Sequence, residues 1–363
     1  MECWEFLTDA WLSSLVGQQL NIEHFDVLEA EGNSSSTLVK VQCKTDTLML
    51  KVTRQVAADA LAALVDREAL FYQTAWQQLH DFGVGLLDLR GVEIRPDMSV
   101  IVLEFVKERR QAEALISLLA RVHAWGLKGK DSLPWLQDCR DGYLLKHGLP
   151  DLFRSSVAKI TEEKTEALLG TADTRNVMDM LQTLAKPGLY EFAVDMVMQS
   201  SPMTIVHMDA RQGNAFFEED HATAEGVKLF DWQNVSRGGG ALDLAYTLSG
   251  SLSVCDRRAW QEDLLAQYLQ EFCQLSGSSY SLDELKDDYR KALIWPLVWA
   301  ALTCADVEGT VDHCAGPILG GACSAEELAK RSHAREVARD FVTVGAERYL
   351  RAALDEGSAH VVG

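Results

Sequence analysis

Three polar side chains that could bind a cation or move a proton follow two apolar runs in the middle of the chain. Asp209 and Asn214 lie five positions apart in HMDARQGN (207–214), directly after the run TIV, and Asp231 ends the run VKLF. If the two runs form neighbouring strands, the three side chains converge. A buried carboxylate without a partner costs several kcal/mol, so the cluster needs internal hydrogen bonds or a charged ligand.

Oxygen ligands of this kind suit Mg²⁺, which binds one or two carboxylates, keeps several waters and accepts phosphate oxygens. A carboxylate that does not touch the metal could instead orient a hydroxyl group and take its proton. The alternative is that Asp209 and Asp231 only cap turns after strands. The presence of both together with Asn214 favours a functional site.

Two charged residues nearer the N-terminus interrupt apolar patterns. Helical spacing places Glu68 beside an apolar stripe that includes Leu64 and Val65, and Lys51 interrupts the apolar strand LMLKV. Because an unpaired buried ammonium is costly, we predict that Lys51 pairs with Glu68. The alternative is a lysine that reaches solvent from an edge strand and a glutamate at the margin of its stripe.

The elements that position these residues divide the chain into two parts. After a short helix at about 5–20, the first part has strand patterns around one helix at 57–79: FDVLEA, TLVKVQC, TLMLKV, VGLLDLRGVEI and SVIVLEFV. The second part is mainly helical, with helices expected at 112–125, 155–170, 175–200, 256–275, 282–303 and 324–356. We predict an α+β protein with an N-terminal lobe (1–106) and a C-terminal lobe (107–363).

Composition narrows the possible partners. The chain has 363 residues, of which 47% are hydrophobic and 24% charged, as in ordinary globular proteins. With 34 basic and 54 acidic residues, its net charge of −20 disfavours nonspecific binding to nucleic acid or anionic lipid. We therefore expect a cationic or small-molecule partner, no nucleic acid and no membrane.

Cysteine usage and the N-terminus indicate a cytoplasmic protein. The eight cysteines show no CxxC spacing, and a zinc site made of Cys304, His313, Cys314 and Cys323 would match no familiar pattern. The N-terminus lacks the basic segment of a secretory signal, and no apolar run approaches the ~20 residues of a membrane span.

Three motifs occur in the order HMDARQGN, KLFDWQ (228–233) and GGGALDLAYTLSGSL (238–252). They resemble the aminoglycoside phosphotransferase and choline kinase-like superfamily, most of all its ecdysteroid kinase-like branch, whose members carry H-x-D-x-x-x-x-N, I-D-[FW]-[EQ] and D-L-A-Y in that order. The resemblance covers about residues 15–255. It implies a bilobal, protein-kinase-like fold with an antiparallel sheet and one helix in the small lobe and a mainly helical large lobe.

The resemblance also implies ATP- and Mg²⁺-dependent transfer of the γ-phosphate to a hydroxyl group of a small molecule. Such a reaction needs positioning and charge neutralisation more than covalent help from the protein. By analogy, Asp209 would orient the acceptor hydroxyl and take its proton, while Asn214 and Asp231 would hold Mg²⁺. Lys51 would contact the phosphates and be held in place by Glu68.

Further nucleotide contacts are implied in the N-terminal part. The main-chain groups of Glu104 and Val106 would hydrogen-bond the adenine edge. Gly32, Ser34 and Ser35 of EGNSSST occupy the place of the phosphate-covering loop, although any hairpin turn has a similar composition.

Several residues next to these motifs suit structural roles. His207 is expected to brace the loop and Asp243 of D-L-A-Y to anchor it, while Met208 stands where the family usually has glycine. No arginine precedes Asp209, and no A-P-E segment follows Asp231, so a protein substrate is not expected.

The acceptor pocket is the least constrained part of the sequence. Trp295 and Trp299 share one helical face, with Asp306 and Glu308 nearby, and such an aromatic wall would suit an amine. Paired tryptophans at this spacing also occur in cores, and Trp232 could either shape the site or pack beneath it. The acceptor therefore stays open among an amino alcohol, a sterol-like alcohol and an aminoglycoside-like compound.

Two other functions use some of the same residues. A catalytically inactive nucleotide-binding scaffold would use the same fold, but the intact Asp209, Asn214 and Asp231 argue against it. A metal-dependent hydrolase using His207, Asp209 and Asp231 would leave Lys51 without a role.

Overall fold

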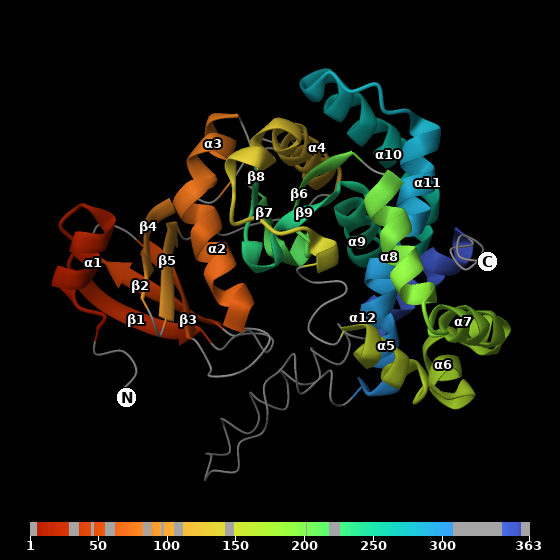
Figure 1. Cartoon of the computed structure of the whole chain (residues 1–363). Coiled ribbons are helices and arrows are strands. Elements are labelled where there is room, and N and C mark those ends of the chain that lie inside the picture. Colours follow the sequence, from red (N-terminus) through yellow and green to blue (C-terminus); the bar gives the residue numbers. More distant parts are fainter. Residues whose placement is uncertain are drawn as a thin grey trace, which may run out of the picture.

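A five-stranded antiparallel sheet forms the N-terminal part of the protein (Figure 1). The computed structural model describes residues 6–28, 36–44, 47–54, 62–82, 86, 89–95, 98–104, 112–141, 149–200, 202–217, 226–307 and 343–356. The strand order is β1-β2-β3-β5-β4, with β1 Ile22–Leu28, β2 Ser36–Cys43, β3 Thr47–Arg54, β4 Leu89–Ile94 and β5 Met98–Glu104.

The two faces of this sheet have different tasks. Leu48, Leu50 and Val52 of β3 are buried in a core that includes Leu12 of helix α1 (Asp9–Val16). Helix α2 (Ala62–Thr74) contacts β4 and β5 and lies on the other side of the sheet from α1 (Figure 1). Because side chains alternate along a strand, Lys51 emerges on the α2 face, where Glu68 lies.

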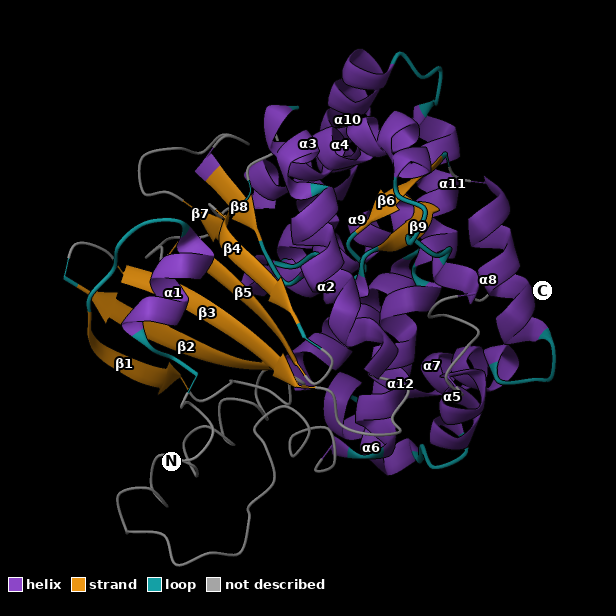
Figure 2. Ribbon diagram, turned by 60° about the vertical axis from the view of Figure 1, so that its left-hand side comes forward, coloured by secondary structure: helices purple, strands orange, loops and turns teal. Residues whose placement is uncertain are grey.

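The C-terminal part is mainly helical (Figure 2). After α3 (Trp76–Asp81), the helices are α4 Ala112–Gly129, α5 Leu149–Val157, α6 Glu162–Leu169, α7 Thr171–Leu184, α8 Leu189–Ser200, α9 Ala241–Ser251, α10 Val254–Ser276, α11 Leu282–Ala292 and α12 Ile294–Ala305. Residues 343–355 are also helical. Among the residues that the structure describes, none of these helices has both the length and the apolarity of a membrane span.

The predicted α+β class is confirmed. The predicted boundary between the two lobes, at residues 106 and 107, lies outside the described residues.

Several predicted helices are divided in the structure. The predicted helix 175–200 is two helices, α7 and α8, because the intervening segment contains Pro187 and Gly188, and Gly188 has a φ of +82°. The predicted helix 282–303 breaks at Leu293, and Pro296 cannot donate a hydrogen bond to Ala292. The helices predicted at 57–79 and 155–170 are likewise interrupted, the first at Ala75 and the second before α6. Because the apolar residues recur on both sides of each break, their spacing alone predicted one continuous helix.

Helix α9 was not predicted. Every residue from Ala241 to Ser249 is buried, so the segment lacks the alternation of polar and apolar faces that marks a surface helix. The helix is nevertheless central, because it carries the D-L-A-Y segment.

Two short sheets hold the polar motifs. The TIV and VKLF strands, which as neighbours would bring the three side chains together, are not paired with each other. Strand β6 (Met203–Val206) pairs with β9 (Ser236–Gly239), and β7 (Ala215–Phe217) pairs with β8 (Val227–Leu229). The β7–β8 pairing places Asn214 beside the end of the VKLF run, because the Phe230 amide donates to the Asn214 carbonyl at 3.0 Å. These sheets lie between α2 and the C-terminal helices (Figure 1).

Close packing of α4 on β6 fixes the start of the 207–214 loop. A Cβ atom on Gly126 would lie 2.5 Å from the backbone nitrogen of Ile205 and would also clash with Thr204. The Thr204 hydroxyl donates to the His123 carbonyl at 2.6 Å. Helix and strand can approach this closely only because residue 126 has no side chain.

We predict opposite effects for two glycine-to-alanine substitutions in helices. Gly126→Ala should lower the free energy of unfolding by roughly 2 kcal/mol or more, because it overpacks α4 against the β6 backbone. Gly345→Ala is the matched control: its Cβ would meet only Tyr349, at 3.9 Å, so alanine should be neutral or stabilise the helix by up to about 1 kcal/mol. Urea unfolding of both variants measures the difference. Equal effects would contradict the packing argument.

Candidate active site

A buried ammonium joins the N-terminal sheet to the end of β8. Lys51 Nζ lies 2.8 Å from Glu68 Oε2, which confirms the predicted pair, and it also contacts Asp231 Oδ1. Lys51 is only 8% exposed and Glu68 only 3%, so the contact is shielded from solvent. Asp231 has a left-handed backbone (φ +68°), which turns its side chain back after the strand.

Both partners of the Lys51–Asp231 contact stay charged. Burial by itself would lower the pKa of Lys51, but the charges of Asp231 and Glu68 outweigh burial and raise the pKa above its usual value. Burial by itself would raise the pKa of Asp231, yet Lys51 holds that pKa below its usual value. One cation is thus shared by two carboxylates. Burial raises the pKa of Glu68 above its usual value although the Lys51 charge opposes this, so Asp231 is the partner that holds its negative charge more firmly.

The Asp209 carboxylate is held on both oxygens. Asn214 Nδ2 donates to Asp209 Oδ2 at 2.8 Å and to the Asp209 carbonyl at 2.9 Å, while Arg211 Nε donates to Oδ1 at 3.3 Å. Burial raises the pKa of Asp209 above its usual value, although the Arg211 charge opposes this. A fixed carboxylate with a raised pKa suits a group that accepts a proton.

Arg211 was missed in the sequence, although it stands between the two predicted residues. Its guanidinium approaches the backbone so closely that a Cβ on Gly213 would lie 2.5 Å from Arg211 Nη1. The signal was the combination of one arginine and one glycine within HMDARQGN. A cation in this loop can only be recognised as an Asp209 partner once the fold of the loop is known.

Asp243 fixes the unusual backbone of the 207–214 loop. Met208 has a φ of +67°, a conformation that favours glycine, which explains why glycine is usual there. The amides of His207 and Met208 both donate to the Asp243 carboxylate at 2.7 Å, and the Trp295 indole N–H donates to the Met208 carbonyl at 2.9 Å. These three hydrogen bonds hold the strained residue in place. The anchoring role implied for Asp243 is therefore confirmed.

A buried relay supports Asp243 from behind. His123 Nε2 donates to Asp243 Oδ2 at 3.1 Å, and the Tyr268 hydroxyl donates to His123 Nδ1 at 2.8 Å. All three side chains are buried. The loop is thus tied to α4 and α10 as well as to α9.

His207 braces two loops, as the resemblance implied. Its Nε2 donates to the Phe230 carbonyl at 2.9 Å, and its Nδ1 accepts from the Asp209 amide at 3.3 Å. Its ring also packs on Trp232, with 4.6 Å between the ring centroids. His207 therefore connects the residue before Asp231 to the backbone of Asp209.

The tryptophans expected at the acceptor are mostly in the core. Trp232 is fully buried and stacks on Phe71 with ring centroids 4.1 Å apart, and Trp295 is 1% exposed. Neither ring offers a face to a ligand, so the structure favours the core interpretation for both. Trp299 is half-buried and meets Trp295 edge to face at 5.6 Å, while Glu308 lies outside the described residues.

Part of the predicted nucleotide site cannot be placed. Gly32, Ser34, Ser35 and Val106 lie outside the described residues. Glu104 ends β5, where its backbone is the register partner of Leu48. The proposed roles of all five stay predictions.

The charged side chains of this site would suit a magnesium–phosphate complex. Glu68, Asp209 and Asp231 are three carboxylates against the two cations Lys51 and Arg211, and Glu68 Oε1 is buried without a hydrogen-bond partner. Within the described ranges, no group of three or more His, Cys, Asp or Glu side chains could hold a metal by itself. A cation here would thus draw further oxygen ligands from elsewhere, which is how Mg²⁺ is bound beside phosphates.

Only one of the four residues considered for a zinc site, Cys304, lies within the described part of the chain. Cys304 is a buried free thiol, and burial raises its pKa to about 12, which disfavours the thiolate that zinc requires. His313, Cys314 and Cys323 lie outside the described residues.

Solved structures share this fold. Spectinomycin phosphotransferase APH(9)-Ia, in complex with ADP and spectinomycin, is 11% identical, with 93% of this chain and 97% of that chain covered and a TM-score of 0.51. An aminoglycoside phosphotransferase from Alicyclobacillus acidocaldarius subsp. acidocaldarius DSM 446 is 14% identical over 96% of each chain, also at 0.51. The microcompartment-associated aminopropanol kinase is 13% identical, with 92% and 93% covered, at 0.50. At such identities the likeness establishes the fold alone.

A family model identifies the family of the chain. The model described as "DUF1679: Uncharacterized oxidoreductase dhs-27" matches residues 91–314, more than half of the chain. Comparison with curated proteins gave no match. The description names an oxidoreductase, whereas the fold of this chain is that of kinase-like phosphotransferases. The chain therefore belongs to the DUF1679 family, and this match agrees with the ecdysteroid kinase-like resemblance of its motifs.

Proposed function

We propose that the protein is an ATP- and Mg²⁺-dependent O-phosphotransferase that transfers the γ-phosphate to a hydroxyl group of a small molecule. The observation that carries the proposal is the buried contact of Lys51 with Glu68 and Asp231, within electrostatic reach of the fixed Asp209 carboxylate. It combines a cation for phosphate, oxygen ligands for a metal and a proton acceptor.

The nucleotide side of the site would be assembled from three elements. Asn214 and Asp231 would hold Mg²⁺, which neutralises charge on the phosphate oxygens. Lys51 would contact the phosphates, with Glu68 keeping its ammonium on the α2 face of the sheet. The Asp231 carboxylate and the phosphate oxygens would together favour a divalent cation between them.

The acceptor side depends on Asp209. Its carboxylate would orient the acceptor hydroxyl and take its proton as the oxygen bonds to phosphorus, while ADP leaves. Arg211 and Asn214 keep the carboxylate from rotating. The acceptor is proposed to be a small alcohol, such as an amino alcohol, a sterol-like alcohol or an aminoglycoside-like compound.

A phosphorylation screen tests this function. Purified protein is incubated with ATP, Mg²⁺ and a panel of hydroxylated metabolites, and phosphorylated products are detected by mass spectrometry and ³¹P NMR. We expect a phosphate monoester from at least one class of alcohol and equimolar ADP. Nucleotide binding without turnover across the panel would support the inactive scaffold, and turnover without ATP would support a hydrolase.

Asp209→Asn should retain Mg·ADP binding and lose turnover by about 10²- to 10⁴-fold, because the amide cannot accept the proton. Steady-state kinetics and isothermal titration calorimetry measure the two effects. Asp131→Asn, a change of the same type at an exposed residue, is the control and should leave both unchanged. Full activity of Asp209→Asn would remove Asp209 from the mechanism.

Asp231→Ala should weaken nucleotide binding mainly when Mg²⁺ is present. We expect the Kd for ADP to rise about tenfold or more with Mg²⁺, or about 1.4 kcal/mol, and to change little in EDTA. Calorimetry under both conditions separates the cases. Equal weakening in EDTA would mean that Asp231 acts only by holding Lys51.

The pH dependence should report Asp209. Its pKa is raised above the usual value of about 3.9, and the deprotonated form is the active one. The value of kcat/KM should therefore be constant at higher pH and fall as the pH decreases through this raised pKa. The residual activity of Asp209→Asn should lack this acidic limb. An identical limb in the variant would assign it to another group.

A further inference from the structure

Three side chains of α9 bind the backbone of the loop that follows β6. Asp243, Thr247 and Ser251 are spaced four residues apart, so they lie along one side of the helix. In addition to the Asp243 contacts, the Thr247 hydroxyl donates to the Ala210 carbonyl at 2.6 Å. The Gln212 amide donates to the Ser251 hydroxyl at 3.0 Å. One side of α9 therefore follows the loop over its whole length.

These contacts fix the loop at alternate residues. The backbones of Met208, Ala210 and Gln212 are bound to α9. Asp209 and Arg211 stand between them in the chain, and their side chains contact each other, with 3.3 Å between Arg211 Nε and Asp209 Oδ1. The backbone on both sides of Asp209 is thus held by α9, and this sets the position from which its carboxylate projects.

The Thr247 contact is shielded from solvent at both ends. Thr247 and Ala210 are both 0% exposed. Because water cannot replace the hydroxyl, the Ala210 carbonyl would lose its partner if the loop moved away from α9. The contact therefore favours one position of the loop relative to the helix.

The end of α9 that carries Ser251 is held by a supporting helix at residues 343–355. Arg348 Nη1 of this helix donates to the Gly250 carbonyl at 3.1 Å. The last four carbonyls of a helix have no partner within the helix, so the Arg348 guanidinium caps the end of α9. The supporting helix lies beyond residues 91–314, which the family model matches.

Ring packing adds to this cap. Tyr349 stacks on Tyr246 of α9, with ring centroids 5.5 Å apart and 27° between the planes. A Cβ on Gly250 would lie 3.0 Å from the Tyr349 hydroxyl, so the two helices approach each other closely where residue 250 has no side chain. A shift of the end of α9 would disturb these contacts.

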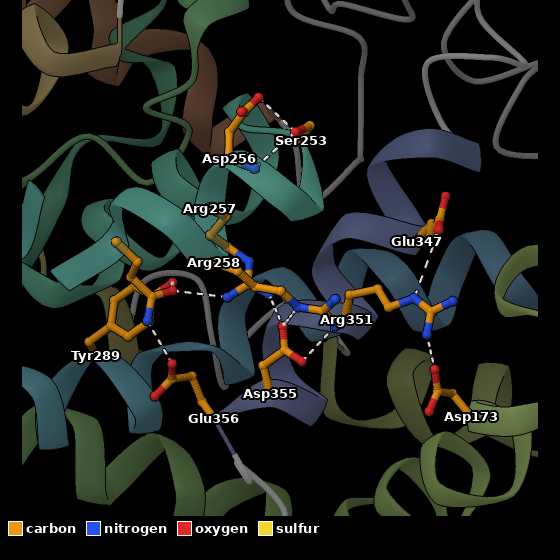
Figure 3. A network of polar contacts seen from close by, with 11 residues as sticks. Asp173, Ser253, Asp256, Arg257, Arg258, Tyr289, Glu347, Arg351, Asp355 and Glu356 are labelled. Carbon is orange, nitrogen blue, oxygen red and sulfur yellow. Dashed lines mark hydrogen bonds and ion pairs between the residues drawn. The ribbon is translucent and has the colours of Figure 1, made fainter.

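Ion pairs fix the supporting helix to α10 and α7 (Figure 3). Asp355 accepts from Arg258 Nε at 2.8 Å and from Nη2 at 2.9 Å, and it also pairs with Arg257. Arg351 pairs with Asp173 of α7. Because Arg257 is only 2% exposed, moving the supporting helix away would leave a buried guanidinium without this carboxylate.

We propose that α9 sets the backbone path of the 207–214 loop for phosphoryl transfer, with Thr247 and Ser251 as positioning residues and the supporting helix fixing their end of α9. The kinetic part of this inference rests on the proposed function. The alternative is that both hydroxyls only satisfy backbone groups and contribute to stability. The two differ in whether loss of a hydroxyl slows phosphotransfer in a protein that stays folded.

Thr247→Val tests the proposal, because it removes the hydroxyl and keeps the shape of the side chain. The kcat should fall roughly tenfold, since Asp209 is held less firmly, while the Kd for Mg·ADP stays within about twofold. Thr247→Ser restores the donor and should recover most of the kcat.

Thr165→Val is the matched control for Thr247→Val. The Thr165 hydroxyl is also 0% exposed, and it donates to the Thr161 carbonyl at 3.1 Å at the start of α6. Both valine variants should be less stable in urea, but only Thr247→Val should lose kcat. An unchanged kcat in Thr247→Val, or an equal loss in Thr165→Val, would refute the positioning role.

Hydrogen exchange tests the same positioning without turnover. In Ser251→Ala the Gln212 amide loses its acceptor, so its exchange, followed by NMR of ¹⁵N-labelled protein, should become about three- to tenfold faster. Ser249→Ala removes a hydroxyl of the same helix that donates to the Ala245 carbonyl, and it should leave this rate unchanged. An unchanged rate in Ser251→Ala would refute the role of α9.

The supporting helix is tested through its cap. Arg348→Met removes the guanidinium that binds the Gly250 carbonyl, so exchange of the Gln212 amide should become about threefold faster. Arg140→Met, which breaks the pair with Asp195, is the control and should have no effect. An unchanged rate in Arg348→Met would exclude the supporting helix from positioning. Faster exchange without phosphotransfer in the wild type would refute the proposed function and keep the role of α9 in shaping the loop.

Discussion

The buried carboxylate of Asp243 is the contact on which the geometry of the site depends. It accepts the amides of His207 and Met208 and so holds a non-glycine residue in the left-handed conformation. His123 and Tyr268 fix the carboxylate from the opposite side. Because these polar groups are buried, breaking one of the hydrogen bonds would leave its donor or acceptor without a partner. This cost favours the observed conformation of the 207–214 loop.

Lys51 connects this rigid loop region to the sheet. The sheet supplies the ammonium, α2 supplies Glu68, and Asp231 follows β8, so three elements meet at one buried charge. Two carboxylates surround this ammonium, and carboxylate oxygens are the ligands that the proposed magnesium-bound triphosphate would need. Arg211 balances part of the charge on the Asp209 side.

Sequence reasoning succeeded where the signal is local. The motif spacing predicted the grouping of Asp209 with Asn214, and helical periodicity together with an interrupted strand predicted the Lys51–Glu68 pair. It failed for α9, which has no polar face, and for the strand pairing, which depends on the order of strands in space. The hydrogen bond from the Trp295 indole to the Met208 carbonyl could not be predicted either, because it forms only when the 207–214 loop is folded against α12.

The sequence by itself determined the fold class and the family and supplied the candidate site residues, because each of these depends on residue types at short, fixed separations. Only the tertiary structure decided that Lys51 contacts Asp231, 180 positions away, and that Arg211 faces Asp209. Contacts of this kind are set by how helices and sheets pack. Packing joins residues that are far apart in the chain, so it cannot be deduced from the spacing of residues within a short motif.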